Sequence, residues 1–573
     1  MRTRLIWIGV PILVVIALFA GWRLFSHEPR PYMVASAERQ ASEAGVEILR
    51  QGGNALDAAI AVEAVLGLIE PQSSGLGGGA YLLYWDAGNK ALTSYDGRET
   101  APHVIDPGAF LDADGKERSY IDAMLSGQSV GTPGLVKMLW LAHQKHGRLA
   151  WKDLFAPAIR LANTGFPVSP RLAGWLKLDP ALAKMPGADK YFYRTDASGA
   201  RMPLVEGDIL KNPAYAQTLE LIAGEGPDGF YKGPVAQSIV DAVTNAPRRP
   251  GALTLDDLRN YEAKERAPVC GPYRAFRVCG MGPSSSGGVT TLQILGILQS
   301  FDMGAIRPLS LEAVHFMSEA SKLAFADRNL YLGDPDVHAP PVAQMLAPAY
   351  LRSRADLIDP SRTMGQAKPG VLPEVKAEQF APNSDISLPS TSHFSIVDGD
   401  GNAIAMTASI EGPFGSHLMA SGFLLNNELT DFSAFATDNG RPVANAVAPG
   451  KRPLSSMSPT IVFDKEGALY ATLGSPNGTR IIGYVSQMLI ALIDWHMGVQ
   501  QAVDLPHVVD MNGPLELEEG TSVVALEPTL RQLGHEVVIT KQPSGIQAIV
   551  VTPQGLQGAA DPRREGVVLD GKL

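Results

Sequence analysis

Apolar strands separated by short polar turns recur along the chain and predict antiparallel β-hairpins. The turn residues include glycine, asparagine and aspartate, as in the DGDG stretch at 398–401, and such residues adopt the backbone angles that tight hairpins need. The irregular spacing between the hairpins excludes a solenoid. The four predicted hairpins span residues 81–98, 393–409, 460–475 and 547–561.

Segments of helical periodicity lie before and between these hairpins. Asn54 is a typical N-cap for the second of them, and Gly52-Gly53 ends the first. Sheets that bury one face against each other and helices that cover the outer faces are the natural packing of such elements, so the predicted class is α+β. The predicted helices span 42–49, 55–68, 311–330, 480–495 and 527–533.

The N-terminus carries an uncharged apolar run, residues 5–22, between Arg4 and Arg23. A run of this length is at the lower limit for a membrane-spanning helix, and no small-residue cleavage site follows it directly. We therefore predict a cytoplasmic tail at 1–4, an uncleaved transmembrane signal-anchor at 5–22 and a linker at 23–30. A cleaved signal peptide is the alternative, and in both cases the remaining chain is placed in the periplasm or outside the cell.

Composition narrows the function classes. Hydrophobic residues make up 45% of the chain and charged residues 19%, which excludes a disordered chain and a multi-span membrane protein. The net charge of −11 argues against a nucleic-acid partner.

Cys270 and Cys279 lie on two short predicted strands, directly opposite each other if Arg274-Ala275 form the turn. They form a candidate disulfide, with two unpaired thiols as the alternative.

Several common catalytic motifs are absent or out of context. No metal-binding motif is present, and the pair His315 and Glu319 on one helix face is predicted to be structural. The stretch at 75–80 (GLGGGA) matches a dinucleotide fingerprint, but a helix precedes it and a strand follows it, which is the wrong order. A G-x-S-x-G stretch at 127–131 is a weak nucleophile candidate, because no acid and histidine partners are marked downstream. We expect neither a metal nor another cofactor.

Thr391 is the stronger nucleophile candidate. The segment 359–390 is rich in proline, serine and charge, has no hydrophobic period, and ends where a predicted hairpin begins. If the chain were cut between Ser390 and Thr391, the new α-amine would be a base beside the threonine hydroxyl. An α-amine titrates near neutrality and needs little tuning for that role. The ordinary alternative is a threonine at the start of a strand.

Long, specific motifs occur in order along the chain: QGGNALDAAIA (51–61), SGLGGG (74–79), DGRETAP (96–102), PSSSGG (283–288), ADRNLYLGDPD (326–336), TSHFSIVDGDGNA (391–403), GFLLNNELTDFS (422–433), GKRPLSSMSPT (450–460) and ADPRR (560–564). With these motifs the chain resembles the gamma-glutamyltransferases (gamma-glutamyl transpeptidases, glutathione hydrolases) of the N-terminal nucleophile hydrolases. The resemblance implies a four-layer αββα sandwich with two stacked antiparallel sheets, made as one precursor and cut between Ser390 and Thr391. The products would be a large subunit, 31–390, and a small subunit, 391–573.

The resemblance also implies a site. The planar guanidinium of Arg98 would form two hydrogen bonds with the substrate α-carboxylate, and several acidic side chains would bind the α-ammonium. An acidic protein would thus bind a zwitterionic substrate. Thr391 would attack the γ-carbonyl, and backbone N–H groups would stabilise the oxyanion. The remaining assignments are Ser455 and Ser456 as carboxylate donors, Glu411, Glu428 and Asp431 as ammonium ligands, Ser409 as the partner of the nucleophile, and Asn477 and Gly478 as the oxyanion hole.

The expected activity is cleavage of γ-glutamyl amides such as glutathione through a γ-glutamyl-Thr391 ester, with transfer to water or to an amino acid or peptide acceptor. The segment 434–450 is shorter than the usual lid of the family, which favours hydrolysis. Two related alternatives are a cephalosporin (glutaryl) acylase and an enzyme that processes poly-γ-glutamate. A non-enzymatic alternative is an unprocessed, membrane-anchored binding protein.

Overall fold

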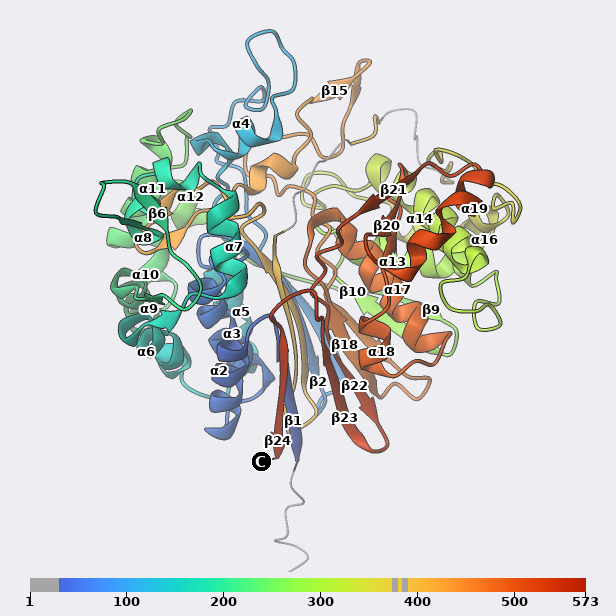
Figure 1. Ribbon diagram of the computed structural model, residues 1–573, viewed down its shortest axis with the longest axis horizontal. Helices are drawn as coiled ribbons and strands as arrows, with labels where there is room; N and C mark the ends of the chain where they lie inside the picture. The colour runs from blue at the N-terminus through green and yellow to red at the C-terminus, as the bar shows by residue number, and fades with distance from the viewer. Residues whose placement is uncertain (1–29, 374–379, 384–389, 573) are drawn as a thin grey trace, which may run out of the picture.

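A computed structural model describes residues 30–373, 380–383 and 390–572 (Figure 1). The predicted anchor at 5–22 and its flanks up to residue 29 lie outside the described residues. Within the described part, no helix is both long and apolar enough to cross a membrane. The anchor and the membrane location therefore stay predictions.

A seven-stranded sheet carries the candidate nucleophile. Its strand order is β24-β1-β11-β12-β2-β3-β8, and all neighbouring strands are antiparallel. The central hairpin β11–β12 and the edge strand β24 follow residue 390 in the sequence, whereas the strands β1 and β2 that flank the hairpin precede it. Both halves of the chain therefore build one sheet. The strands are β1 (Pro31–Ser36), β2 (Gly79–Asp86), β3 (Ala91–Asp96), β8 (Lys264–Arg266), β11 (Ser392–Val397), β12 (Ala403–Ser409) and β24 (Val567–Lys572).

A six-stranded antiparallel sheet has the order β23-β22-β18-β17-β10-β9. All four predicted hairpins are confirmed, as β2–β3, β11–β12, β17–β18 and β22–β23. Cys270 on β9 lies opposite Cys279 on β10, and the two sulfurs form a disulfide. The strands are β9 (Val269–Tyr273), β10 (Phe276–Gly280), β17 (Thr460–Phe463), β18 (Leu469–Gly474), β22 (Gln547–Thr552) and β23 (Gly555–Ala560).

The small sheets were not predicted. In the three-stranded sheet, β20 and β21 pair in parallel, which requires a crossover connection that no short-range pattern reveals. The other small sheets are two-stranded. The three-stranded sheet contains β19 (Val508–Val509), β20 (Leu515–Glu518) and β21 (Val537–Thr540), and the others pair β4 (Phe166–Pro167) with β7 (Ile209–Leu210), β5 (Tyr193–Thr195) with β6 (Arg201–Pro203), β13 (Met419–Ala420) with β14 (Phe423–Leu424), and β15 (Thr437–Asp438) with β16 (Arg441–Pro442).

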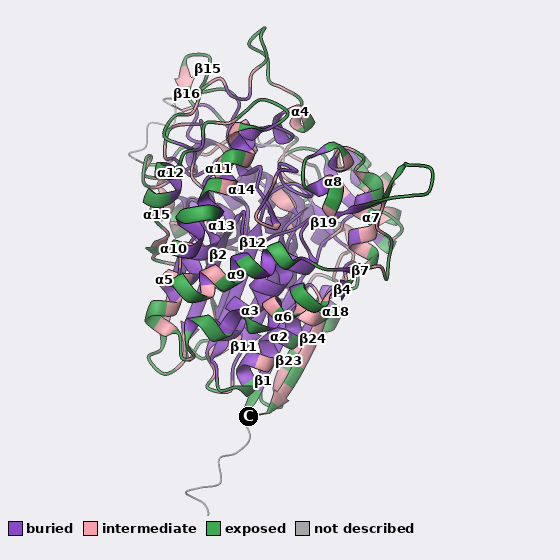
Figure 2. Cartoon of the chain, turned by 90° about the vertical axis from the view of Figure 1, so that its left-hand side faces the viewer, coloured by how far each residue is buried: buried purple, intermediate pink, exposed green. Residues whose placement is uncertain are grey.

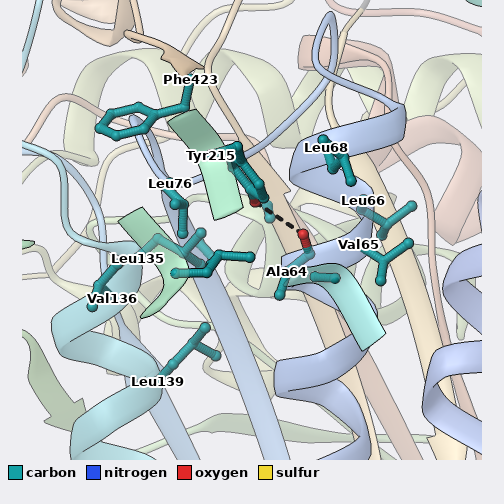
Figure 3. Packing of buried hydrophobic residues seen from close by; sticks show 14 of the residues in the cluster. Ala64, Val65, Leu66, Leu68, Leu76, Leu135, Val136, Leu139, Tyr215 and Phe423 are labelled. Atoms are coloured by element: carbon teal, nitrogen blue, oxygen red, sulfur yellow. Dashed lines mark hydrogen bonds between the residues drawn. The ribbon is translucent and has the colours of Figure 1, made fainter. Parts of the chain in front are cut away.

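Helices cover the outer face of the seven-stranded sheet, on the left of Figure 1. Asn54 caps α3 with a capping box, as predicted, and α3 is buried along its whole length. Figure 3 shows this core, in which the Tyr215 hydroxyl donates to the Ala64 carbonyl at 2.9 Å. The helices on this side and above it are α2 (Arg39–Arg50), α3 (Ala55–Ile69), α4 (Tyr120–Met124), α5 (Leu135–His146), α6 (Ala156–Thr164), α7 (Pro170–Leu178), α8 (Ala188–Tyr191), α9 (Pro213–Glu225), α10 (Asp228–Tyr231), α11 (Gly233–Thr244) and α12 (Leu255–Asn260).

A second group of helices covers the six-stranded sheet, on the right of Figure 1, and shares a core with it. The predicted helices at 311–330, 480–495 and 527–533 are confirmed as α14, α17 and α19. In Figure 2 the first group of helices faces the viewer, and α6 and α9 expose residues on their outer sides, whereas the strands β2, β11 and β12 behind them are buried. In the second group, α14 and α17 are buried along almost their whole length. This group contains α13 (Gly287–Leu298), α14 (Leu311–Tyr331), α15 (Val342–Met345), α16 (Pro348–Ala355), α17 (Ile481–Ile493), α18 (Val499–Val503) and α19 (Glu527–Gln532).

The two large sheets share a separate core cluster, which joins residues from both of them. Alternation along β1 shows the arrangement: Val34 packs with the helices, whereas Met33 and Ala35 pack with Phe463 and Ile549 of the other sheet. Because both faces of these strands are buried, their sequences read as continuous apolar runs. The molecule is thus a mixed α/β fold of antiparallel sheets and covering helices. The described parts of 359–390 contain neither helix nor strand, as predicted.

Candidate active site

Thr391 lies directly before β11, at the end of the central hairpin, and is buried. Its φ angle is +83°, which is unfavourable for a β-branched residue. Such strain persists only where the surrounding structure imposes it. The Thr391 N–H donates to the Ser73 carbonyl at 3.2 Å, and Arg564 donates to the Thr391 carbonyl at 2.9 Å. The surroundings therefore hold this residue on both sides.

The bond between Ser390 and Thr391 is held at its carbonyl oxygen. The Asn477 N–H donates to the Ser390 carbonyl at 3.1 Å, and the Ser390 hydroxyl donates to the Gln72 carbonyl at 2.6 Å. Asn477 adopts a left-handed conformation with φ +103°, which asparagine tolerates better than most residues. The structure thus brings a predicted oxyanion donor onto the carbonyl of the predicted cleavage site. Gly478 lines the adjoining hollow.

Ser409 lies at the end of β12, and its hydroxyl is 3.1 Å from the Thr391 hydroxyl. It also accepts the Glu411 N–H at 2.8 Å. The glycine loop packs closely behind it, because a Cβ on Gly78 would lie only 2.0 Å from the Ser409 carbonyl oxygen. This close approach gives a physical reason for glycine at position 78.

Arg98 follows β3 and is buried. Its guanidinium forms ion pairs with Glu428 and Asp431. It also donates to the backbone carbonyls of Pro453, at 3.1 Å, and Leu454, at 3.0 Å. Residues separated by about 330 positions in the sequence thus meet at one cation.

Acidic groups outnumber this cation. Burial raises the pKa of Glu428 to about 7, although Arg98 opposes the rise. Burial and the neighbouring Asp431 and Glu428 raise the pKa of Glu411 well above its usual range. Burial and Glu428 do the same for the pKa of Glu99, beside Arg98. Oxygen atoms of Glu99, Glu411 and Glu428 have no hydrogen-bond partner among the described residues. The cluster is therefore suited to receive a further positive group.

Ser455 and Ser456 complete the hollow that contains Thr391. The Ser456 hydroxyl accepts from the buried Arg328 at 3.0 Å, and the Ser455 hydroxyl accepts from the Met457 N–H at 3.1 Å. The hollow has about 330 Å³ of empty space, counted with its mouth. It is lined by Arg98, Thr391, Ser409, Glu411, Glu428, Asp431, Leu454, Ser455, Ser456, Met457, Gly478, Thr479 and Ile481. All predicted site residues except Ser390 and Asn477 line this hollow, and those two hydrogen-bond each other behind it.

Sequence analysis missed several residues at this site. Tyr120, at the start of α4, donates its hydroxyl hydrogen to Glu411, and Asn427 donates to the same carboxylate at 2.9 Å. Arg564 and Ser73 hold the backbone of Thr391. No periodicity or motif spacing links these residues to residue 391, although Glu99 could have been noticed as the neighbour of Arg98.

The weaker candidates have structural roles. The Ser129 hydroxyl of the G-x-S-x-G stretch donates to the carbonyls of Met124, at 2.9 Å, and Ser126, at 2.8 Å. Ser129 is buried in a short 3-10 helix, Gly127–Ser129, and no histidine of the described residues hydrogen-bonds to it. His315 and Glu319 join His535 in a buried cluster whose cation is the Lys322 ammonium.

Comparison with known proteins shows which family this chain belongs to. The gamma-glutamyltranspeptidase family model matches residues 41–570. The chain belongs to the gamma-glutamyltranspeptidase family. Curated members include the "Glutathione hydrolase proenzyme" of Escherichia coli (strain K12), 40% identical over 545 residues, or 93% of this chain and 90% of the relative. The protein of the same name from Bacillus subtilis (strain 168) is 35% identical over 94% of this chain and 91% of its own length. This enzyme family also includes acylases, such as "Acylase ACY 1 proenzyme" of Pseudomonas sp. (strain SE83), 35% identical, with 94% of each chain covered.

Solved structures of the family share the fold. A cephalosporin acylase from Bacillus halodurans superimposes with a TM-score of 0.82 at 28% identity, covering 94% of this chain and 96% of that one. A gamma-glutamyltranspeptidase from Pseudomonas nitroreducens gives 0.53 at 33% identity, covering 58% of this chain and 96% of that one. The predicted family is confirmed, and both named activities occur among its solved relatives.

Proposed function

We propose that this protein is a gamma-glutamyltransferase, or glutathione hydrolase, that matures by cutting itself between Ser390 and Thr391. The observation that carries this proposal is the paired geometry at Thr391, whose hydroxyl faces Ser409 while Asn477 holds the adjacent carbonyl. The word "proenzyme" in the relatives' names supports the maturation step. The products are a large subunit, 31–390, and a small subunit, 391–573. The two large sheets and their covering helices then form a four-layer αββα sandwich to which both subunits contribute strands.

In the maturation step, the Thr391 hydroxyl attacks the Ser390 carbonyl carbon. Asn477 stabilises the negative charge on the oxygen, and the nitrogen of Thr391 leaves as an amine once it is protonated. Water then hydrolyses the ester and frees residue 390. The positive φ angle of Thr391 supports this step, because chain cleavage releases the constraint on that torsion.

In turnover, the new α-amine of Thr391 accepts the proton of its own hydroxyl. The Ser73 carbonyl, which already accepts from this nitrogen, orients the amine. The hydroxyl attacks the γ-carbonyl of the donor, and the amine of the donor's leaving group takes up the proton. Asn477 and Gly478 stabilise the oxyanion, and Ser409 directs the hydroxyl. Water or an acceptor amine then cleaves the γ-glutamyl ester.

The acidic residues select the acyl group. A γ-glutamyl group brings one carboxylate and one ammonium. Arg98, Ser455 and Ser456 bind the carboxylate, and Glu411, Glu428 and Asp431 bind the ammonium. A glutaryl group has the carboxylate but lacks the ammonium, so it would leave these buried acids without a counter-charge. The excess of acids over Arg98 therefore favours γ-glutamyl donors over glutaryl donors.

The acylase function is the second candidate, and the similarity to the Bacillus halodurans cephalosporin acylase supports it. Processing of poly-γ-glutamate is a third. The short segment 434–450 supports water over an acceptor as the second substrate. We place the enzyme in the periplasm or outside the cell, held by its N-terminal anchor. No cofactor enters the proposed mechanism.

Hydrolysis of γ-glutamyl-p-nitroanilide and glutaryl-p-nitroanilide, each with and without a dipeptide acceptor, tests the assignment. We expect kcat/KM to be higher for the γ-glutamyl donor and the acceptor to accelerate release only modestly. A preference for the glutaryl donor would assign the acylase function instead. Activity on neither substrate, in protein that has cut itself, would reject both.

A further inference from the structure

A second hollow lies beside the candidate active site. It has about 910 Å³ of empty space, counted with its mouth, against about 330 Å³ for the hollow at Thr391. Its floor is apolar and contains the buried side chains of Phe110, Ala123 and Phe432. Arg118 and Tyr120 also line it.

Tyr120 lies between the two hollows. It lines the second hollow, while its hydroxyl donates to Glu411, which lines the first. Asn427 fixes this contact by donating to the Tyr120 hydroxyl at 3.2 Å and to the Glu411 carboxylate at 2.9 Å. Two consecutive residues also lie between the hollows, since Thr430 lines the second and Asp431 lines the first.

The direction of the donor follows from the proposed function, on which this inference rests. The γ-carbonyl lies at Thr391, and the α-nitrogen lies among Glu411, Glu428 and Asp431. The wall that contains Tyr120 is built on two of these acids. A substituent on the α-nitrogen therefore points at this wall, whereas the leaving group departs from the opposite, γ-carbonyl end of the donor.

We propose that Tyr120 determines donor specificity by closing the α-nitrogen end of the donor pocket, and that the hollow behind it is a subsite for an acyl group on that nitrogen. With tyrosine in place, donors need a free α-amine. With a small residue in place, the two hollows join, and γ-glutamyl donors whose α-nitrogen is acylated can bind. The chemical class includes chains in which one γ-glutamyl unit acylates the next.

The chemistry of the hollow suits such a group. The apolar floor fits an aliphatic acyl stem, and Arg118 can pair with a carboxylate at its end. An acylated nitrogen is neutral and still donates one N–H. Glu411 can accept that hydrogen, since one of its oxygens has no partner among the described residues.

The test compares Tyr120→Ala with wild type on γ-glutamyl-p-nitroanilide and on its N-acetyl and N-succinyl derivatives. We expect the ratio of kcat/KM for the N-acetyl donor to that for the free-amine donor to rise at least about tenfold, the scale of steric discrimination in pockets. Tyr120→Phe should keep the wild-type ratio, because the ring and not the hydroxyl closes the subsite. Ile121→Ala, an exposed neighbour outside the hollow, is the matched control.

Arg118→Gln locates the substituent. Added to Tyr120→Ala, it should lower kcat/KM for the N-succinyl donor several-fold and leave the N-acetyl donor unchanged. Cleavage of the variant's own chain between Ser390 and Thr391 shows that the variant has folded correctly. If Tyr120→Ala does not cut itself, Tyr120→Leu replaces it in the test. An unchanged ratio in a self-cleaved variant overturns the proposal. A wild type inactive on γ-glutamyl-p-nitroanilide overturns the proposed function instead, so the two failures are distinguishable.

Discussion

Two buried polar clusters in this protein differ in how completely their atoms are paired. In the cluster of His315, Glu319, His535 and Lys322, every side-chain polar atom has a hydrogen-bond partner. The Lys322 ammonium lies 2.9 Å from Glu319 and 3.4 Å from His535. In the Arg98 cluster, carboxylate oxygens of Glu99, Glu411 and Glu428 have no hydrogen-bond partner in the described part of the chain.

This difference in hydrogen bonding distinguishes a structural cluster from a cluster that can bind a ligand. A buried acceptor without a partner costs stability, so a cluster that retains several of them beside an open hollow is built for a ligand. The His315 cluster instead fastens α14 to the segment after Ile358, since Glu319 accepts from the Thr363 hydroxyl and the Met364 N–H.

Replacing Thr391 should have the largest effect. Thr391→Ala removes the hydroxyl that attacks in both reactions, so we expect no cleavage at 390/391 and a loss of at least about 1,000-fold in hydrolysis of γ-glutamyl-p-nitroanilide. Denaturing gels and initial rates measure the two effects. Thr391→Ser is the matched control and should retain partial cleavage. Normal turnover by Thr391→Ala would place the nucleophile elsewhere.

Replacing Arg98 tests the carboxylate side of the cluster. Arg98→Ala should lower kcat/KM by about 100-fold or more for γ-glutamyl and glutaryl donors alike, because both carry the distal carboxylate. A γ-aminobutyryl donor, which lacks that carboxylate, should lose much less. Arg98→Lys keeps the positive charge but cannot form two parallel hydrogen bonds to a carboxylate, so its kcat/KM should lie between those of wild type and Arg98→Ala. Equal losses on all three donors would remove Arg98 from carboxylate recognition.

The pH dependence tests the acid side. The pKa of Glu428 is raised to about 7, so the carboxylate that binds the α-ammonium is lost as pH falls through that value. KM for the γ-glutamyl donor should therefore fall several-fold as pH rises from about 6 to about 8. The Thr391 α-amine titrates in the same range, so the effect is read as the difference between wild type and Glu428→Gln. The same slope in both proteins would assign it to another group.

Changes in the His315 cluster should leave activity unaltered and lower stability. Lys322→Met leaves Glu319 without its cation, and we expect the free energy of unfolding to fall by about 3 kcal/mol. Urea denaturation monitored by fluorescence measures this change, with Glu312→Gln on the same helix as the control. A loss of kcat/KM with unchanged stability would erase the distinction between the two clusters.

Much of the fold could be predicted from local pattern. The four hairpins and α3 with its Asn54 cap follow from alternation, turn residues and capping, which are short-range effects. The parallel pair β20–β21 could not be predicted, because partners across a crossover leave no local signal.

The residues of the candidate site also differ in whether the sequence alone indicated them. Thr391 was marked by the polar segment that ends beside it. The placing of Arg98 and Glu428 in one site came only from the family resemblance, and their direct ion pair was not predicted. Tyr120 had no signal, and Asn427 lay within the motif at 422–433 without an assigned role, because the contact between the two side chains forms only after folding.

The central claim is that one threonine is created as a chain end and then acts as the nucleophile. Intact-mass measurement of the purified wild type, before and after brief mixing with a γ-glutamyl donor, tests it most directly. The account predicts a small chain with the mass of residues 391–573 that gains one γ-glutamyl group on Thr391. A single uncut chain, or an acyl group mapped to any other residue, would contradict the account.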